Sequence, residues 1–454
     1  MATTTTLFIC GAMGDLTSRL LLPALAQLLD LEPDRDVHLV GVGRRDVTDD
    51  EWRDRVRKSF GDDACSAARD VAEHARFIRA DISTPEGVRS VLEQAHGRSV
   101  LYFAVPPSVA QEACEAMSGI DLPDDLMLAL EKPFGTDEDS AREFNEKLTR
   151  LVPENQVFRV DHFLGQSILL DMLGVRFANR VFEPVWSAEH IESVVIRYDE
   201  TLGLEGRAGY YDKAGALIDM MQSHLLELLA AVAMDPPASL DERDLRDATG
   251  AALRATRLWD GDPVRSSRRA RYTAGEAGGK ELPSYVDEDG VDPSNNTETL
   301  AEATFEVTTA RWAGVRFILR SGKAIQPAIQ EIALHFRPVR HLPPQFRGHT
   351  APNVLRFTFG PDAMSLRLNV HDGTNPFDLA GTDLSADLGE GSLRAYAEVL
   401  SGILDGDATL AVRGDAAEQC WRIVAPIIDA WNADEVPLDE YPAGSDGPES
   451  WHRV

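Results

Sequence analysis

The sequence predicts an α/β domain with a doubly wound parallel sheet, followed by an α+β domain with a large, mainly antiparallel sheet. Two observations lead to this prediction. At 454 residues the chain exceeds the length of about 250 to 300 residues at which single hydrophobic cores stop growing, so two domains are expected. Short apolar runs alternate with helical stretches in the first third of the chain, whereas strand-like runs dominate the remainder.

The first part of the chain carries the pattern of a parallel sheet. From Thr5 to about Asp161, amphipathic segments separate short apolar runs, namely TLFIC, VHLVGVG, RFIRAD, VLYFAV, LMLAL and VFRVD. Strands buried on both faces have such apolar runs, and the helices between them connect parallel neighbours. We expect the boundary near residues 165 to 180, with residues 1–170 in the first domain and 171–454 in the second.

The second part changes character after one apolar helix, expected at about Ser167 to Arg180. Its strand-like runs alternate apolar and polar residues, which favours an antiparallel sheet with one covered face; they are SVVIRYDE, AEATFEVTT, VRFILRS, EIALHF, NVLRFTF and SLRLNV. Segments 265–280 and 285–296 are rich in Gly, Asp, Asn and Ser, so they are expected to be loops. The tail 434–450 is rich in Pro, Gly and acids and is expected to run irregularly over the surface.

Charge and composition narrow the possible partners. The chain has 45 Lys and Arg against 75 Asp and Glu, a formal net charge of −30, which disfavours nucleic acid and anionic membranes as partners. Any anionic ligand must therefore meet a local basic pocket. The 4 cysteines lie far apart without CxxC spacing, so neither a zinc site nor a disulfide framework is expected. The N-terminus has no targeting signal, and we expect a cytoplasmic protein.

A glycine turn follows the first apolar run, in LFICGAMGDLTSRLLLPAL. Gly11 and Gly14 would let the backbone approach a pyrophosphate, and the helix from about Asp15 would offer free N–H groups. This arrangement is typical of a Rossmann dinucleotide site. The spacing GxxGDL differs from the common GxGxxG, however, so the turn alone leaves binding undecided.

Two arginines end the next strand, at the point where an NAD-binding domain usually has an acid for the ribose hydroxyl. Arg44 and Arg45 in VHLVGVGRR favour NADP, because a 2′-phosphate needs a cation. The alternative is a pair of solvated surface arginines.

A lysine follows the strand LMLAL, in the turn EKPFG. Lys132 would lie in the crevice beyond the strand end, where open α/β sheets bind ligands. The alternative is again a solvated lysine, but lysine is rare in this arginine-rich chain, and we favour a functional role.

A histidine interrupts an apolar helix in LIDMMQSHLLELLAAV. His224 lies on one stripe with Leu217, Met220, Met221, Leu228 and Ala231. It is either a core histidine or a general base, which a carboxylate would have to orient. Asp161, at the end of its strand in RVDHFLG, could be that carboxylate. Asp219 lies on the adjoining helical face, where polar groups could bind hydroxyls.

Together these motifs resemble blocks of the glucose-6-phosphate dehydrogenase family, in order and through the whole chain. The matching segments are GAMGDLTSR, LEKPFG, RVDHFLG, LEGRAGYYDKAGALIDMMQSHLLELL, RYTAG, RWAGVRFILRSGKAI, YAEVLSGIL, CWRIVAPII and YPAGSDGP. The resemblance implies an NADP-binding Rossmann domain over 1–170, a substrate-binding and oligomerisation domain over 171–454, and a homodimer or homotetramer formed through the large sheet.

The resemblance also implies roles for individual residues. His224 matches the catalytic base and Asp161 the acid that orients it. The substrate-binding positions are Lys132, His162, Gln166, Glu200, Asp219 and Lys323. The cofactor-binding positions are Gly11, Gly14, Asp15, Leu16, Arg44 and Lys132. The implied reaction is removal of the C1 hydroxyl proton of a sugar by His224, with hydride passing to NADP, with NAD as the alternative cofactor, to leave a lactone; it requires no metal.

The sequence departs from the family around the sugar phosphate. Phe163 and Gln166 stand where the family usually has tyrosine and lysine, and Leu20 and Ala328 stand where basic residues are expected. Losing several charge-assisted hydrogen bonds, at about 1.5 to 3 kcal/mol each, would weaken phosphate binding severely. Either arginines such as Arg207, or members of the 265–271 cluster, replace these contacts, or the substrate is an unphosphorylated or differently substituted aldose.

Two further alternatives stay open. A non-catalytic dinucleotide-binding homologue is disfavoured by the presence of both Asp161 and His224. A member of the broader group of Rossmann oxidoreductases with an EKP turn would account for Lys132 but not for the block from EGRAGYYD to QSHLLE.

Overall fold

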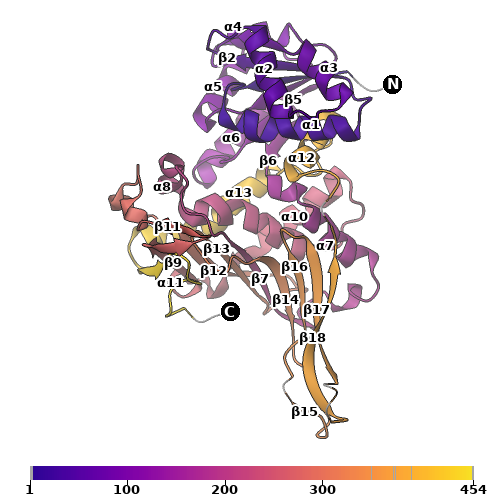
Figure 1. The fold of residues 1–454 in the computed structure, drawn as a ribbon, viewed down its shortest axis with the longest axis vertical. Coiled ribbons are helices and arrows are strands. Elements are labelled where there is room, and N and C mark those ends of the chain that lie inside the picture. Colours follow the sequence, from indigo (N-terminus) through magenta and orange to yellow (C-terminus); the bar gives the residue numbers. More distant parts are fainter. Residues whose placement is uncertain (1–3, 349, 372, 374, 390, 452–454) are drawn as a thin grey trace. The chain divides into compact units, whose positions relative to one another are not determined.

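The chain folds into two compact units (Figure 1). The computed structural model describes residues 4–348, 350–371, 373, 375–389 and 391–451. Unit 1 consists of Met1–Ser167, Pro237–Gly250 and Gly391–Trp421, and unit 2 of Ile168–Pro236, Ala251–Glu390 and Arg422–Val454. The chain thus first leaves unit 1 near the expected boundary, and two later segments return to it.

Unit 1 is built on a six-stranded parallel sheet, which confirms the predicted doubly wound fold. The strand order is β3-β2-β1-β4-β5-β6. The strands are β1 Thr5–Cys10, β2 Val37–Gly43, β3 Arg76–Arg79, β4 Arg98–Phe103, β5 Leu126–Glu131 and β6 Val157–Val160. The order reverses between β1 and β4, and ligands of such sheets bind beyond the carboxyl ends of the strands at this point.

Two groups of helices pack in unit 1. The first contains α1 Leu22–Leu31, α2 Asp49–Phe60 and α3 Ser66–His74, and the second contains α4 Pro85–Leu92, α5 Pro107–Met117 and α6 Glu138–Leu151. Helix α12, Ala395–Asp405, comes from late in the chain and packs on α1 through a shared apolar core. Single turns of helix, η2 Glu154–Gln156 and η3 His162–Gly165, precede and follow β6.

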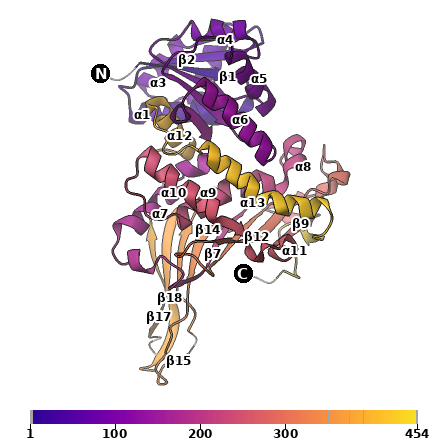
Figure 2. The ribbon, with the colours of Figure 1, turned by 180° about the vertical axis from the view of Figure 1, so that it is seen from behind.

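Unit 2 is built on an eleven-stranded sheet of mainly antiparallel strands, as predicted. Its order is β15-β18-β17-β16-β14-β7-β13-β12-β9-β19, with β8 also paired to β12. The strands are β7 Ile191–Asp199, β8 Thr256–Leu258, β9 Ser267–Thr273, β12 Leu300–Val307, β13 Arg316–Gly322, β14 Gln330–Phe336, β15 Arg347–Gly348, β16 Val354–Thr358, β17 Ala363–His371, β18 Asp378–Asp387 and β19 Leu438–Pro442. The hairpin of β17 and β18 extends from one end of this sheet (Figure 2).

Helices cover part of this sheet. They include α7 Ser167–Ala178, α8 Ala208–Ala216, the π-helical segment η5 Leu217–Leu225, α9 Leu226–Ala233 and α11 Pro263–Ser266. Helices α10 Glu242–Ala255 and α13 Gly414–Asn432 run across the unit boundary in sequence. Smaller elements are β10 Gly275–Ala277, β11 Lys280–Leu282, η4 Glu183–Val185, η6 Trp259–Gly261, η7 Tyr285–Asp287 and η8 Pro293–Asn295.

The helical run Ala208–Ala233 has the length and apolar composition that a membrane crossing requires. However, 78% of its most apolar window is buried inside the protein, and η5 packs against β12 and β13. The run therefore has the burial of a core helix, which explains its apolar sequence without a membrane.

Two expectations about irregular segments are wrong. Segment 265–280 is not a loop, because β9 lies inside the large sheet, where Arg268 pairs with Glu302 of β12 and Ala270 is buried. The tail 434–450 is not wholly irregular, since β19 extends the same sheet and Tyr441 is buried. Sequence analysis missed both strands. Charged residues in β9, and Pro and Gly around β19, conceal the short alternation of buried and exposed positions that is typical of a strand.

A buried arginine holds several segments of unit 1 together. Arg159 of β6 is fully buried, and its guanidinium pairs with both carboxylate oxygens of Glu154, at 2.7 and 3.2 Å. Its Nε donates to Asn145 of α6 at 2.9 Å, and Asn145 in turn donates to the carbonyl of Gly414. Removing one partner from such a network leaves the other charges buried without compensation.

Replacing Arg159 with methionine is therefore expected to lower the free energy of unfolding by about 3 to 5 kcal/mol. Arg150 provides a matched control, because it pairs with Glu146 on the exposed surface of α6. Arg150→Met should change the same free energy by less than about 1 kcal/mol. Urea denaturation of both variants measures the difference, and equal losses would contradict this account.

Candidate functional site

The glycine turn of unit 1 brings the backbone of β1 close to that of β4. Gly11 has φ 91°, and a Cβ there would overlap the backbone of Ala104 and approach Val105 to 2.9 Å. Only glycine fits this position. The turn is closed by the amide of Gly14, which donates to the carbonyl of Gly11 at 2.8 Å. A π-helical turn, η1 Thr17–Leu21, then leads into α1.

Side chains after the turn stabilise it and leave backbone groups for a ligand. Asp15 is exposed and pairs with Arg19 at 3.1 Å, whereas Leu16 packs against the apolar core. The guanidinium of Arg55 donates to the carbonyl of Gly14 at 2.9 Å and to Ser18 Oγ at 2.7 Å.

A cavity of about 380 Å³ opens at this turn. Its lining includes Gly11, Gly14 and both predicted arginines, Arg44 and Arg45, which follow β2. Asp81 lies near Arg44. Hydrogen bonds from Ser83 lower the pKa of Asp81 most, and the charge of Arg44 lowers it further. The cavity thus combines a backbone that approaches closely with two cations at one end, as a phosphorylated dinucleotide requires.

The next polar groups of unit 1 follow β5. Lys132 comes directly after Glu131, whose Oε1 accepts a hydrogen bond from the buried Tyr102 of β4 at 2.5 Å. Burial raises the pKa of Glu131 to about 7, against the lowering effects of Tyr102 and Lys132. Sequence analysis assigned no role to Tyr102 or Glu131, since their contact joins two strands and has no spacing signal.

Asp161 and His162 follow β6 as the sequence predicted. Asp161 is buried, and its Oδ1 accepts from the amide of Phe163 at 3.0 Å, so it caps the turn η3. The ring of His162 stacks on Tyr396 of α12, with centroids 5.2 Å apart and planes inclined by 15°. Burial raises the pKa of Tyr396, and Glu131 and Asp161 add to the rise, so these acids lie near its hydroxyl. Sequence analysis missed Tyr396, although the matching block YAEVLSGIL contains it.

Unit 2 brings Glu200 and Lys323 together. They follow β7 and β13, which are parallel neighbours, and Lys323 Nζ lies 2.7 Å from Glu200 Oε2. Lys323 is only 3% exposed, and its ammonium lies 5.1 Å from the ring centroid of Tyr211. Tyr211 is therefore a further residue of this group, which sequence analysis quoted in EGRAGYYD without assigning a role.

Asp219 and His224 both lie on the π-helical segment η5. His224 is buried, and Asp219 is half-buried five positions before it. Burial raises the pKa values of Tyr210 and Tyr211, and the charge of Asp219 raises them further. The carboxylate of Asp219 therefore lies on the side of the segment that faces these tyrosines. A π-helical stretch inside a helix occurs frequently at functional sites.

The arginines considered as replacements for lost phosphate contacts differ in availability. Arg268 pairs with Glu302, and Arg269 pairs with Asp434 at 3.2 Å, so both already have acidic partners within unit 2. Arg207 lies at the start of α8, near Tyr210. Burial and Asp219 raise the pKa of Tyr210, and the charge of Arg207 opposes this rise. Among these three, Arg207 is the one that shares a neighbour, Tyr210, with a predicted substrate residue, Asp219.

Comparisons with known proteins agree with this arrangement. The family model described as "Glucose-6-phosphate dehydrogenase, NAD binding domain" matches residues 8–170, and "Glucose-6-phosphate dehydrogenase, C-terminal domain" matches residues 173–454. A glucose-6-phosphate 1-dehydrogenase of Gluconobacter oxydans (strain 621H) is 38% identical over 463 residues, which span 97% of this chain and 94% of the relative. A relative with the same description from Treponema pallidum (strain Nichols) is 33% identical and is covered over 92% of its length.

Solved structures show the same similarity. A glucose-6-phosphate 1-dehydrogenase from Mycobacterium avium superposes with a TM-score of 0.86 at 30% identity, covering 99% of this chain and 96% of that one. A glucose-6-phosphate dehydrogenase in complex with its substrate glucose-6-phosphate gives a TM-score of 0.88 at 26% identity, with the same coverage. Because the two family models match nearly the whole sequence, the chain belongs to the glucose-6-phosphate dehydrogenase family.

Proposed function

We propose that this protein oxidises C1 of glucose 6-phosphate to 6-phosphogluconolactone, as an NADP-dependent cytoplasmic enzyme of the pentose phosphate pathway. The family consists of oxidoreductases that act on a CH–OH group of a sugar phosphate. The observation that carries the proposal is the position of His224, a buried imidazole on a π-helical segment, with Asp219 on the same segment. Residues 1–170 are the NADP-binding domain, and 171–454 bind the sugar and form the oligomer.

The chain's own residues carry the proton transfer. His224 takes the proton of the C1 hydroxyl as that carbon becomes a carbonyl, and Asp161 holds the imidazole in the orientation that can accept it. NADP, when bound, supplies the nicotinamide carbon that accepts the hydride. Lys132, Glu200, Asp219 and Lys323 bind the sugar, so that the base and the reacting carbon are held in place.

The cofactor assignment rests on the cavity of unit 1. Its turn requires glycine, because a Cβ at Gly11 would overlap the backbone of Ala104. A turn without a side chain lets the backbone approach a pyrophosphate. Gly14 closes the turn and lines the cavity, Asp15 and Leu16 provide backbone N–H groups, and Arg44 is the cation for the 2′-phosphate, which distinguishes NADP from NAD.

The sugar phosphate needs cations that this chain supplies in an unusual set. His162, Lys132 and Arg207 are the proposed partners, with Gln166 as a neutral donor. The competing proposal, an unphosphorylated or differently substituted aldose, is favoured by Phe163, which has no hydroxyl and is buried, and by the missing charge at Gln166. The two proposals share the same hydride chemistry and differ only in the affinity for phosphate.

Oligomerisation through the large sheet is also proposed. Apolar residues of β17 and β18 continue the buried face of β16 outward, because Leu366 is paired with both Leu355 and Leu384. Leu355 is fully buried, whereas Leu384 is 64% exposed. A second copy of the chain would cover this stripe in a homodimer or homotetramer.

The phosphate requirement tests the main proposal. The ratio of kcat/KM for glucose 6-phosphate to that for glucose should be about 10² or more, because two charge-assisted hydrogen bonds contribute at least about 3 kcal/mol. Arg207→Ala should lower this ratio about tenfold while leaving turnover of glucose unchanged. Nicotinamide absorbance measures both rates. A ratio near one would favour the unphosphorylated aldose.

The general base is tested by His224→Ala. This variant should lose about 10² to 10⁴ in kcat, because the hydroxyl proton loses its acceptor. His335 of β14 is a matched control, since it is another histidine of unit 2 and lies on a strand of the large sheet. His335→Ala should retain the wild-type kcat. Unchanged turnover in His224→Ala would instead show that another group takes the proton, whereas a wild-type protein without turnover of any aldose would support the non-catalytic homologue.

The cofactor preference is tested by Arg44→Ala. Loss of a charge-assisted contact to the 2′-phosphate should raise the KM for NADP about 10- to 100-fold. NAD has no such phosphate, so its KM is the internal control and should change little. A similar rise for both cofactors would place Arg44 elsewhere in the site.

A further inference from the structure

The helical run that carries His224 is broken just before η5. Gly215 has φ 62° and ψ −179°, so the backbone leaves the helix there and re-enters it at Ala216. The amide of Leu217 still donates to the carbonyl of Ala214, but the break leaves fewer acceptors within the helix for the first N–H groups that follow it. Ala216 and Leu217 are buried, so water does not readily supply further acceptors.

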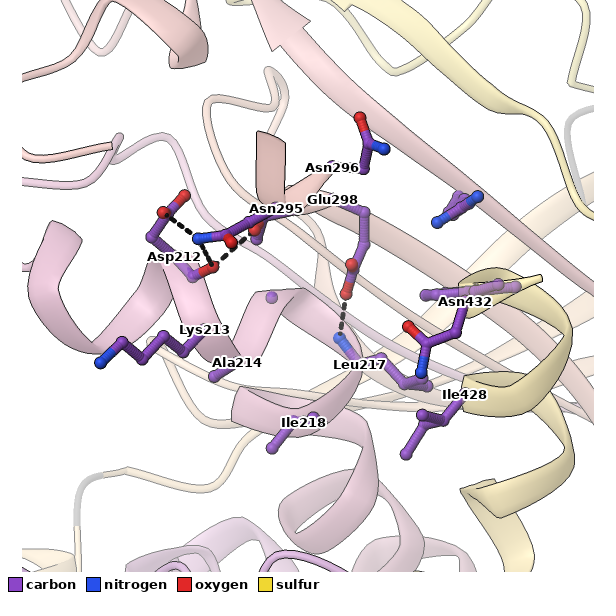
Figure 3. A pocket seen from close by; sticks show the side chains of 14 residues that line it. Asp212, Lys213, Ala214, Leu217, Ile218, Asn295, Asn296, Glu298, Ile428 and Asn432 are labelled. Carbon is purple, nitrogen blue, oxygen red and sulfur yellow. Dashed lines mark hydrogen bonds between the residues drawn. The ribbon is translucent and has the colours of Figure 1, made fainter. Parts of the chain in front are cut away.

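Glu298, just before β12, supplies acceptors at this break. Its Oε1 accepts from the amide of Leu217 at 2.9 Å, and its backbone carbonyl accepts from the amide of Ala216 at 3.3 Å (Figure 3). Leu217 is the first residue of the π-helical segment. The side chain of Glu298 therefore contacts the backbone at the point where the unusual helical geometry begins.

The fit between Glu298 and the break is close. A Cβ on Gly215 would overlap the carboxylate, with Oε2 only 2.6 Å away, so the carboxylate packs directly on the Cα of this glycine. The neighbouring acid Asp212 could not replace it, because its oxygens accept from Tyr285, Asp292 and Asn295. Figure 3 shows Glu298 directed at Leu217 and Asp212 directed at the loop of Asn295.

The carboxylate is held here although burial opposes its charge. Burial raises the pKa of Glu298 to about 7, and the backbone donors and Arg269 only partly counteract this rise. The other charged or titratable groups near it are Asp212, Lys213, Tyr211, Tyr285 and Arg269. Because the folded-state pKa lies above the ordinary value, ionised Glu298 opposes folding at neutral pH and above.

We propose that Glu298 is a positioning residue for His224 and Asp219, which fixes the start of η5 through the amide of Leu217. The inference rests on the proposed role of His224 as the base. A shift of the helix start by one residue would move every later side chain of η5, and a displacement of about 1 Å at a reacting group can lower the rate about 10²-fold. Glu298 itself touches no reacting atom in this proposal.

Glu298→Leu tests the inference, since leucine has no acceptor oxygen for the amide of Leu217 and carries no charge. We expect kcat to fall about 10- to 100-fold. The KM for NADP should not change, because the cavity assigned to NADP is lined only by residues of unit 1. The thermal midpoint at pH 8 should change little, because the weaker cap is offset by removal of a buried charge. A residue that only stabilised the start of the helix would instead lower kcat and the thermal midpoint together.

Two comparisons sharpen the test. Glu288→Leu is the matched control, because Glu288 is another acid of unit 2 and accepts from Tyr272 at 2.7 Å; its kcat should stay at the wild-type value. Gly215→Ala presses on the carboxylate and also forces alanine into a backbone conformation that favours glycine, so it should lower kcat and the thermal midpoint together. The double variant Gly215→Ala/Glu298→Leu should lose less kcat than the product of the single losses, because both changes disturb the contact between Gly215 and Glu298.

The outcomes separate this inference from the proposed function. Wild-type kcat in Glu298→Leu, or a loss that Glu288→Leu shares, would overturn the positioning role even if His224→Ala is inactive. A loss of kcat that only follows a fall in the thermal midpoint would overturn it as well. If His224→Ala is fully active, the proposed role of His224 as the base is wrong, whatever the variants of Glu298 show.

Discussion

A buried helix end must have acceptors for its backbone N–H groups, and the arrangement of unit 2 depends on how this requirement is met. The break at Gly215 separates α8 from η5, and Glu298 bonds to the amide of Leu217. The register of the sheet brings this cap to the same edge as Lys323, because the amide of Lys323 donates to the carbonyl of Thr299, next to Glu298. One edge of the sheet therefore fixes both the start of the helix and the buried lysine.

Electrostatics impose the second constraint. A chain with a net charge of −30 repels an anion at long range, so a sugar phosphate or a dinucleotide must be held by cations at close range. Most cations near the sheet already have acidic partners: Lys323 pairs with Glu200, Arg268 with Glu302 and Arg269 with Asp434. Lys323 can act on a ligand only as part of a pair, which orients it but reduces its net charge. Discrimination between ligands then depends on a small number of additional cations.

The sequence predicted the elements that have a strong local pattern. Apolar runs identified the parallel strands of unit 1, and alternation identified most strands of the large sheet. It did not predict β9 or β19, because their burial comes from neighbours far along the chain. The same limit applies to the site. Asp161, His162 and Lys132 could be placed at strand ends, but the stacking of His162 on Tyr396 and the capping of Leu217 by Glu298 join segments that no spacing connects.

The departures from the family can now be separated by their physical effect. Phe163 is buried in η3, a turn fixed by the carboxylate of Asp161 and by Gly165, where a Cβ would lie 2.5 Å from the carbonyl oxygen of Ala395. Neither constraint involves a side-chain hydroxyl at position 163, so phenylalanine leaves the backbone course of the turn unchanged. The substitution therefore removes a hydrogen-bond donor without displacing Asp161. Gln166 removes a charge at the end of the same turn. Two groups that the family resemblance assigns to the sugar phosphate are thus changed, while the turn that holds Asp161 is not. This combination is expected when substrate specificity changes and the chemistry does not.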